Sequence, residues 1–402
     1  MYCKLHERIA LRGWKLVPYA YYIYGVEQAQ GLTAEQFGLL SRCDGEHDLP
    51  DSPLLQRFLQ AGMIRPCEKG EGLDEWQKPR FYKNRYFPHL NWAITGKCNF
   101  NCLHCFMAAD NAPMMEEFTW EQCLNLLDEC VRCGIQTVTL TGGEPMLHPR
   151  FMDIVRECEK RRLNIAEINT NGSFITEEML DEFHALGMDV LIKISYDGIG
   201  HHDWLRNRPG AEEKAVRAIR LCKEKGFRVR VDIWQFALFN PKTGVYHYQP
   251  VQGQCGKYRD STPVCKGARG TIAVAHTGEL APCNQLSGTF AKMGIRCGNV
   301  KQTPLSEILA GGDYLDMVTM PVTQVSSHNE VCRSCQYWKC CMGGCRAIST
   351  AFTGDFLHYD PSKCAFFKGG YMKRIDDVFA KAKRPYRCSD DTGDMDRAGE
   401  KE

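Results

Sequence analysis

Three closely spaced cysteines are the residues of this sequence best suited to chemistry. Cys98, Cys102 and Cys105 form a CX3CX2C pattern in the stretch GKCNFNCLHC, directly after an apolar run. A zinc site or a disulfide framework usually uses an even number of cysteines, whereas three thiolates leave one coordination position open. Soft thiolates select iron–sulfur clusters, zinc or copper. The spacing predicts a metal or cluster site with one position open for a small molecule.

Polar residues also follow the next apolar runs, where strands are expected to end. TGGEP contains Gly142 and Gly143, which allow a close backbone approach to a ligand, and Glu144, which can accept from an ammonium group. The later runs end in NTNG, residues 169–172, and in SYDG, residues 195–198. A lone GGE is usually a turn, so this motif carries weight only together with the three thiols.

A second group of cysteines lies near the C-terminus. Gly278 and Cys283 form a GX4C step, and CRSCQYWKCCMGGC gives a CX2CX5CX3C pattern. The thiols of this group are Cys265, Cys283, Cys332, Cys335, Cys341, Cys345 and Cys364. CXXC pairs commonly bind zinc, so these residues alone leave iron and zinc open.

Alternating strands and helices must position the first group. Apolar, strand-like runs LNWAIT, QTVTLT, NIAEINT, DVLIKIS and FRVRVDIW alternate with helical stretches such as residues 119–134 and 211–226. This alternation predicts βα units and a parallel sheet, either doubly wound or closed as a barrel. Ligands of such sheets bind at the carboxyl ends of the strands, where the three thiols and Glu144 are expected.

Residues 1–72 form a separate unit, which we call the N-terminal module. WKLVPYAYYIYG suggests one or two strands, and LTAEQFGLL carries a capping box from Thr33 to Gln36 with a Leu32–Phe37 staple. PLLQRFLQAG has the apolar spacing of a helical face and stops at Gly62. The pattern predicts a winged-helix-like α+β module, followed by a polar linker over residues 73–89.

The composition limits the class of protein. The chain has 402 residues, and its 50 basic and 49 acidic residues nearly cancel, so bulk charge gives no reason to expect nucleic-acid or membrane binding. The N-terminus lacks the apolar core of a signal peptide, and no run approaches the length of a membrane span. A cytoplasmic chain with 22 cysteines is expected to use thiols for metal or clusters rather than for disulfides. Cysteines outside the two groups, such as Cys123 and Cys130, are expected to be buried apolar residues.

CX3CX2C followed by GGEP one βα unit later resembles the radical S-adenosylmethionine (radical SAM) superfamily, over roughly residues 90–310. The resemblance implies that Cys98, Cys102 and Cys105 hold a 4Fe–4S cluster, whose fourth iron chelates the amino and carboxylate groups of SAM. It also implies a partial (β/α)6 barrel over residues 90–250, and reductive cleavage of SAM to methionine and a 5′-deoxyadenosyl radical. The SAM contacts carried over by motif are Gly142, Gly143 and Glu144 at the methionine amine, Ser195, Asp197 and Arg206 along the site, and His104 near the adenine.

The C-terminal thiols resemble the SPASM extension of radical SAM enzymes, which binds two auxiliary 4Fe–4S clusters. The resemblance places this domain at residues 251–372, before a C-terminal helix and disordered tail over residues 373–402, and makes zinc the disfavoured alternative. One cluster would be held by Cys332, Cys335, Cys341 and Cys364, and the other by Cys265, Cys283 and Cys345. Cys255 is the candidate fourth ligand of the second cluster, with an open iron as the alternative.

The N-terminal module resembles the RiPP recognition element, a winged-helix domain that binds the leader of a ribosomally made, post-translationally modified peptide (RiPP). Such a domain takes the leader as an added strand. The alternative is a structural extension that packs on the barrel. SPASM enzymes mostly modify peptides or proteins, so the resemblance implies a precursor peptide as substrate, a thioether or carbon–carbon crosslink as product, and a ferredoxin or flavodoxin as reductant.

Three other functions are weighed against this one. Sulfatase-maturing enzymes place an aspartate base directly after the GX4C cysteine, where this chain has Asn284. An amide cannot take a proton, so protein side-chain oxidation of that type is disfavoured, and no catalytic base is identified. Balanced charge disfavours a nucleic-acid-modifying radical SAM enzyme. A winged-helix redox regulator would lack SAM cleavage altogether.

Overall fold

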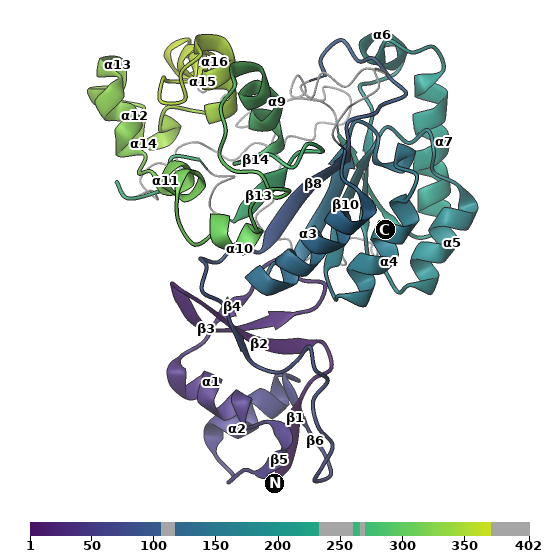
Figure 1. Cartoon of the computed structure of the whole chain (residues 1–402), viewed down its shortest axis with the longest axis vertical. Helices are drawn as coiled ribbons and strands as arrows, with labels where there is room; N and C mark the ends of the chain where they lie inside the picture. The colour runs from purple at the N-terminus through teal and green to yellow at the C-terminus, as the bar shows by residue number, and fades with distance from the viewer. Residues whose placement is uncertain (106–116, 233–259, 266–269, 371–402) are drawn as a thin grey trace, which may run out of the picture. The chain divides into compact units, whose positions relative to one another are not determined.

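The computed structural model describes residues 1–105, 117–232, 260–265 and 270–370 (Figure 1). The chain divides into two compact units. The first consists of Met1–Asp232 and Lys266–Thr319, and the second of Ile233–Cys265 and Met320–Glu402. Each unit is treated separately below.

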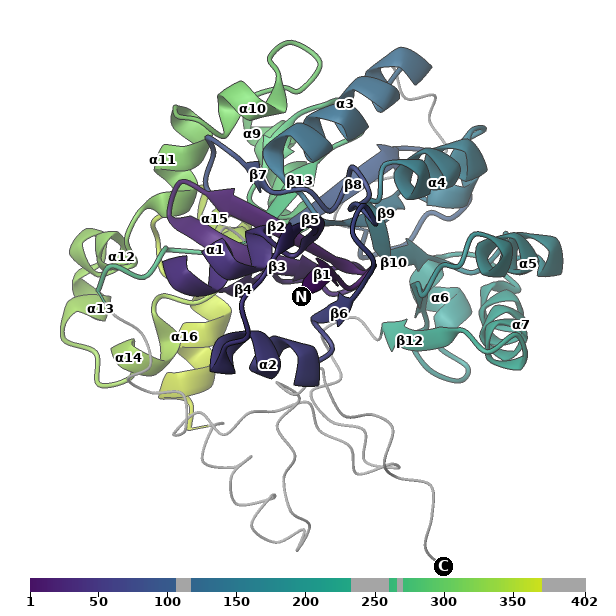
Figure 2. The ribbon, with the colours of Figure 1, turned by 90° about the horizontal axis from the view of Figure 1, so that it is seen from below.

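The N-terminal module contains two small sheets and two helices (Figure 1, Figure 2). One sheet has the order β5-β1-β6, and the other has the order β4-β3-β2-β7, whose last strand comes from the linker. The elements are β1 (Tyr2–Leu5), β2 (Ile9–Trp14), β3 (Val17–Ile23), β4 (Gln30–Gly31), α1 (Ala34–Ser41), β5 (Asp44–Asp48), α2 (Pro53–Gln60), β6 (Ile64–Pro66) and β7 (Arg80–Phe81).

Local sequence signals explain both helices of the module. Thr33 caps α1 and forms the expected capping box with Gln36, and Ser52 caps α2 ahead of Pro53. The expected helices and the capping box are therefore confirmed. Phe37 packs in one apolar core with Leu32 and with residues from both helices and several strands. The assignment of this α+β module to the winged-helix class stays a prediction.

A seven-stranded sheet follows in the first unit, in the order β12-β11-β10-β9-β8-β13-β14. Neighbouring strands from β8 to β12 pair in parallel, as the alternation predicts. The strands are β8 (His89–Thr95), β9 (Thr137–Gly142), β10 (Asn164–Thr170), β11 (Leu191–Ser195), β12 (Arg228–Asp232), β13 (Thr271–Val274) and β14 (Leu280–Ala281). A sixth βα unit after β12 would lie outside the described residues.

Helices between these strands cover one face of the sheet, and Figure 1 shows α4, α5 and α7 along its right side. Leu90, Trp92 and Ile94 alternate along β8 and are fully buried, as a helix-covered face requires. The connecting elements are α3 (Trp120–Cys133), the short 3-10 helix η1 (Pro145–Leu147), α4 (Phe151–Lys160), α5 (Glu177–Ala185), α6 (His202–Arg206) and α7 (Ala211–Glu224).

The segment after residue 270 extends the seven-stranded sheet. β13 pairs in parallel with β8, and β14 pairs antiparallel with β13. The helices of this segment are α9 (Asn284–Met293), α10 (Leu305–Ile308) and α11 (Asp313–Thr319). The buried carboxylate of Glu129 on α3 accepts from the backbone N–H and the hydroxyl of Ser306 on α10. Residues 266–319 thus group with residues 1–232 in the first unit, and their assignment to a C-terminal domain over residues 251–372 stays a prediction.

The second unit consists of short helices joined by tight turns. They are α12 (Thr323–His328), α13 (Glu330–Arg333), α14 (Trp338–Cys341), α15 (Arg346–Thr353) and α16 (Pro361–Lys368). Asp360 caps α16 and also accepts from the backbone N–H of Cys345. The predicted C-terminal helix and tail, residues 373–402, lie outside the described residues. No helix in the described part of the chain is long and apolar enough to cross a membrane.

Candidate active site

The three-thiol loop follows β8 at the carboxyl end of the sheet. Cys98 is buried with Phe100 and with Ala211 at the start of α7, and Cys102 and Cys105 pack against the same small cluster. The backbone N–H of Phe100 donates to the sulfur of Cys98 at 3.4 Å. The structure therefore gathers the three predicted thiols in one place.

The charge state of these thiols depends on their surroundings. Burial, together with the nearby Glu144, Cys102 and Cys105, raises the pKa of Cys98 to about 12, although the hydrogen bond from Phe100 opposes this shift. Burial also raises the pKa of Cys102, although the Arg206 guanidinium opposes this. These thiols keep their protons unless a positive group joins them, and a metal cluster supplies such charge.

The glycines of GGEP are needed for contacts within the chain. A Cβ on Gly142 would lie 2.3 Å from the carbonyl oxygen of Thr95, and one on Gly143 would lie 2.2 Å from that of Lys97. Gly142 also has a φ of 153°, which side chains rarely adopt. The glycines allow the loop after β9 to pass directly against the thiol-bearing loop after β8. The sequence suggested a close approach to a ligand, and the structure adds this second reason.

Glu144 has a completely buried carboxylate. Its oxygens accept from the Thr170 hydroxyl at 2.8 Å, from the backbone N–H of Asn171 at 2.7 Å and from that of Met146 at 3.3 Å. Burial raises the pKa of Glu144 to about 7, although these hydrogen bonds oppose the shift. Glu144 thus fixes the ends of β9 and β10 beside the thiols, and it titrates near neutral pH.

Asp197 and Arg206 form a two-point ion pair beside the thiols. Arg206 donates from Nε and Nη2 to the Asp197 carboxylate at 2.7 and 3.2 Å, and its Nη1 lies 3.9 Å from the sulfur of Cys102. Arg206 and Asp197 both affect the pKa of His104, which burial lowers. The structure therefore places these three predicted residues together with Cys102.

Asn99 and Asn171 were not predicted, yet they join two of the loops. The side chain of Asn171 donates to that of Asn99 at 2.8 Å, which ties NTNG to the thiol-bearing loop. The sequence gave only a weak signal here, namely a polar strand end. Ser195, the last residue of β11, lies at the same edge of the sheet as Glu144 and Thr170.

The donor set suits a cluster with one open position. The three thiols lie together with Glu144 beside Cys98, and no fourth thiol joins their cluster among the described residues. Among the described residues, no three His, Cys, Asp or Glu side chains converge tightly enough to hold a single metal ion. A cluster spreads its thiolates over separate irons, so the three cysteines fit it without meeting around one ion.

Four C-terminal thiols converge in the second unit. Cys332, Cys335, Cys341 and Cys364 line one cavity of about 20 Å³, together with aromatic residues such as Trp338 and Phe367. Burial, together with the nearby Cys332 and Cys364, raises the pKa of Cys341 to about 11. The structure brings together the four residues predicted to hold one auxiliary cluster. Their role as its ligands stays a prediction.

The other predicted set is divided between the two units. Cys283 is the N-cap residue of α9 in the first unit, whereas Cys265 and Cys345 belong to the second. Cys255 lies outside the described residues. Burial lowers the pKa of Arg346, and the thiols of Cys345, Cys265 and Cys341 oppose this shift. The sequence analysis missed this buried arginine, which lies among thiols of both predicted sets.

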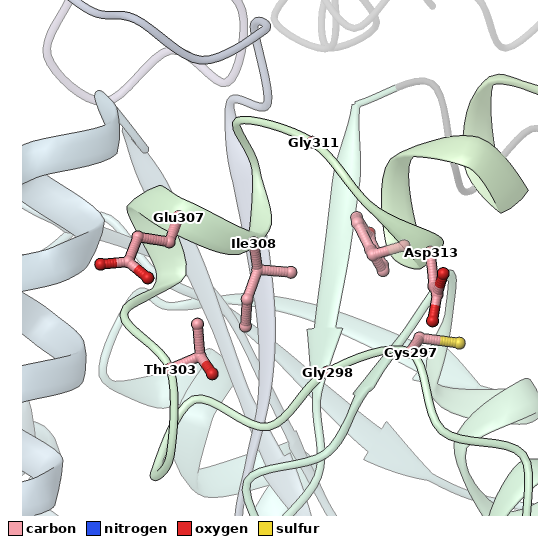
Figure 3. Close-up of a pocket in the computed structure, with 8 residues that line it drawn as sticks. Cys297, Gly298, Thr303, Glu307, Ile308, Gly311 and Asp313 are labelled. Atoms are coloured by element: carbon pink, nitrogen blue, oxygen red, sulfur yellow. The ribbon is translucent and has the colours of Figure 1, made fainter.

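One further pocket, of about 310 Å³, lies among residues 297–314 of the first unit (Figure 3). Among its lining residues Cys297 and Ile308 are buried, whereas Glu307 and Asp313 are exposed and lie apart from each other. Burial raises the pKa of Cys297 to about 11. None of the predicted cofactor residues lines this pocket.

Two family models match the chain. One, described as the radical SAM superfamily, matches residues 92–239, and the other, SPASM, described as an iron–sulfur cluster-binding domain, matches residues 265–336.

Curated relatives include two with different named products. An AdoMet-dependent heme synthase from Methanosarcina barkeri is 24% identical over 344 residues, which covers 68% of this chain and 95% of that protein. The antilisterial bacteriocin subtilosin biosynthesis protein AlbA from Bacillus subtilis is 28% identical over 145 residues, which covers 36% of this chain and 32% of that protein.

Two solved structures share the fold at low identity. His6-tagged anSMEcpe with bound AdoMet has a TM-score of 0.56 at 16% identity, covering 75% of this chain and 96% of that chain. Streptococcus suis SuiB bound to S-adenosylmethionine has a TM-score of 0.57 at 12% identity, covering 90% of this chain and 99% of that chain.

Proposed function

The chain is a radical SAM enzyme with a SPASM domain, and from that premise we propose that it modifies a ribosomal precursor peptide. The proposed reaction is C–H abstraction that leads to a thioether or carbon–carbon crosslink. The two domains imply 4Fe–4S clusters and S-adenosylmethionine as cofactors. The observation that carries the choice of substrate is the N-terminal module, with the exposed aromatic surface described below.

The residues of the three-thiol site would have different roles in binding SAM. Cys98, Cys102 and Cys105 would hold the SAM-binding cluster, which supplies one electron for the reductive cleavage of SAM. Glu144, held rigidly by its neighbours, would accept from the methionine ammonium. Asp197 and Arg206 would line the same site, and the buried loops would exclude water from it.

The N-terminal module has a sheet edge that a strand of another chain could extend. β4 pairs with β3 only at Ala20 and Tyr21, and its own two residues are exposed. Short edge strands leave backbone donors and acceptors for an incoming peptide. An extended leader could add to this edge, where backbone pairing gives affinity and side-chain pockets give specificity.

Aromatic side chains on the strands of this sheet and on α1 could supply such specificity. Tyr19 on β3, Phe37 on α1 and Phe81 on β7 form a chain of ring contacts, with centroids 5.3 and 5.6 Å apart. Phe81 is 64% exposed and Tyr19 is 37% exposed, whereas Phe37 between them is 6% exposed. Exposed apolar groups gathered on one surface are typical of binding sites. We call the exposed rings of Tyr19 and Phe81, together with the buried ring of Phe37 that contacts both, the aromatic surface.

The relatives give further support. SuiB has been crystallised with its precursor peptide SuiA, and AlbA is a subtilosin biosynthesis protein. The SuiB match covers 90% of this chain, so it leaves out fewer residues than the N-terminal module contains and must reach into it. At 12% identity this likeness concerns the fold, and the peptide substrate stays our proposal.

Tetrapyrrole modification is the second candidate. The heme synthase match spans 344 residues and nearly all of that protein. It covers 68% of this chain, however, and the exposed edge strand and aromatic surface of the N-terminal module favour a peptide substrate. Asn284, the first residue of α9, keeps oxidation of the sulfatase-maturing type disfavoured, because its amide cannot act as a base. A ferredoxin or flavodoxin as reductant and a cytoplasmic location stay predictions.

The test compares the two substrates on the reconstituted full-length enzyme with SAM and dithionite. The probes are synthetic Cys- or aromatic-rich peptides encoded beside the gene, and iron coproporphyrin. We expect one peptide to lose two hydrogens by mass spectrometry, and the Tyr19→Ala/Phe81→Ala variant to bind it at least about tenfold more weakly. SAM cleavage without peptide should be unchanged in that variant. A product from the porphyrin alone would overturn the proposal.

Removing residues 1–72 gives a second test of the module. We expect the truncated chain to lose affinity for the peptide while it retains SAM cleavage without peptide. Unchanged peptide affinity would assign the N-terminal module to a structural role.

A further inference from the structure

Arg206 makes a contact that the family resemblance does not explain. The residue is buried, with 9% of its surface exposed, and its Nη1 lies 3.9 Å from the sulfur of Cys102. Nε and Nη2 both bind the Asp197 carboxylate. The resemblance placed Arg206 along the SAM site, whereas the structure also directs it at a predicted cluster ligand.

Asp197 holds this guanidinium in place, and His202 in turn holds Asp197. Its backbone N–H lies 3.1 Å from Nδ1 of His202, and its Oδ2 lies 3.0 Å from the same nitrogen. His202 is fully buried on α6, the helix that also carries Arg206. Burial alone would raise the pKa of Asp197, but His202 and Arg206 lower it overall. Asp197 therefore stays charged and holds the guanidinium of Arg206 in a fixed orientation.

The thiol-bearing loop is tied to the same helix. The backbone N–H of Leu103 donates to the carbonyl of Leu205 at 3.0 Å. Leu103 and Leu205 each adjoin a residue of the contact between Cys102 and Arg206. The distance from the guanidinium to the sulfur is thus set by backbone as well as by side chains.

We propose that Arg206 sets the reduction potential of the SAM-binding cluster by donating a hydrogen bond from Nη1 to the Cys102 sulfur. Asp197 and His202 act as positioning residues for it. A cation that donates to a ligating sulfur withdraws charge from it, and this favours the more negative, reduced form. The potential is therefore higher with Arg206 than without it. The inference rests on the cluster and is independent of the peptide substrate.

The experiment measures the potential of this cluster without SAM or peptide. The reconstituted full-length enzyme is titrated under anaerobic conditions and followed by EPR, using the reduced signal that later addition of SAM perturbs. We expect Arg206→Gln to shift the midpoint potential to a more negative value. Asp197→Asn should shift it in the same direction by less, because the cation remains but loses its fixed position.

Arg208 provides the matched control. It is an exposed guanidinium two residues along the chain, and the structure shows no contact between it and a thiol among the described residues. Arg208→Gln removes the same charge and should leave the potential unchanged. Equal shifts in Arg206→Gln and Arg208→Gln would mean that the potential responds to the loss of any nearby positive charge. That result would contradict the proposed role of the hydrogen bond.

The outcomes also separate this role from SAM binding. An unchanged potential in Arg206→Gln, with weaker SAM binding, would assign Arg206 to SAM alone and overturn the proposal. If Arg206→Gln does not retain its cluster, Asp197→Asn decides, because it preserves the cation. An unchanged potential in Asp197→Asn would then contradict the positioning by Asp197 on which the inference depends.

Discussion

The thiols after β8 and the thiols of the second unit differ in their neighbours. Cys98, Cys102 and Cys105 lie at the end of a parallel sheet, close to a buried carboxylate and a buried guanidinium. The four C-terminal thiols instead line a small cavity with aromatic side chains. Three thiols with polar groups beside them suit a cluster that also binds a small molecule. Four thiols in an apolar cavity suit a cluster that handles electrons alone.

Removing one thiol from each site gives the largest contrast. We expect Cys102→Ala to lower SAM cleavage by at least about 100-fold. Mutating a residue that only hydrogen-bonds to a metal ligand already lowers metal affinity or activity by up to about 100-fold. Cys341→Ala should keep SAM cleavage without peptide and lose only the auxiliary cluster. Both variants are assayed for 5′-deoxyadenosine after reconstitution. Equal loss of cleavage in both would break the division between the two sites.

The Gly143→Ala variant tests whether the close contact between the loops after β8 and β9 is needed for the SAM-binding cluster but not for the auxiliary clusters. The added Cβ would lie 2.2 Å from the Lys97 carbonyl oxygen, so the thiol-bearing loop must move. We expect a loss of about 3 kcal/mol in stability, and a lower SAM-cluster content with normal auxiliary clusters. Chemical denaturation and EPR measure the two effects.

Gly38→Ala, in helix α1 with nothing near the new Cβ, is the control for that change. It should stabilise the chain by about 0.5–1 kcal/mol. A Gly143→Ala variant as stable as the wild type would show that the loops tolerate the added methyl group.

The pH dependence of SAM binding is the smallest expected effect. Burial raises the pKa of Glu144 to about 7, so the carboxylate gains a proton and loses its charge as the pH falls through that value. We expect the affinity for SAM to fall by up to about tenfold per pH unit below pH 7. Glu144→Gln should bind SAM weakly with no such dependence, as measured by anaerobic equilibrium dialysis. A wild-type affinity that is flat from pH 5.5 to 8 would contradict the role of Glu144.

Local patterns predicted much of this molecule. The five strand-like runs, the Thr33 capping box and the placement of Cys98 and Glu144 at strand ends all follow from periodicity and short motifs. These signals depend on residues close in sequence, which is why they can be read without a structure. The ligand roles carried over by resemblance, including that of Cys255, stay predictions.

Contacts between distant segments could not be predicted in this way. β13 pairs with β8 across more than one hundred residues, and Gly143 is required by a carbonyl of another loop. Arg346 gave no motif of its own, yet it donates to the carbonyls of Phe356 and His358 among the C-terminal thiols. Such residues are defined by packing, which one sequence does not reveal.

The central claim is that the chain builds one three-thiol SAM site and two auxiliary clusters. The most direct test is to measure iron, acid-labile sulfide and zinc per chain after anaerobic reconstitution of the full-length protein. Three 4Fe–4S clusters predict roughly 12 irons, with matching sulfide and no zinc. About 4 irons together with bound zinc would contradict the account, because the C-terminal thiols would then be structural and could not take an electron from the substrate.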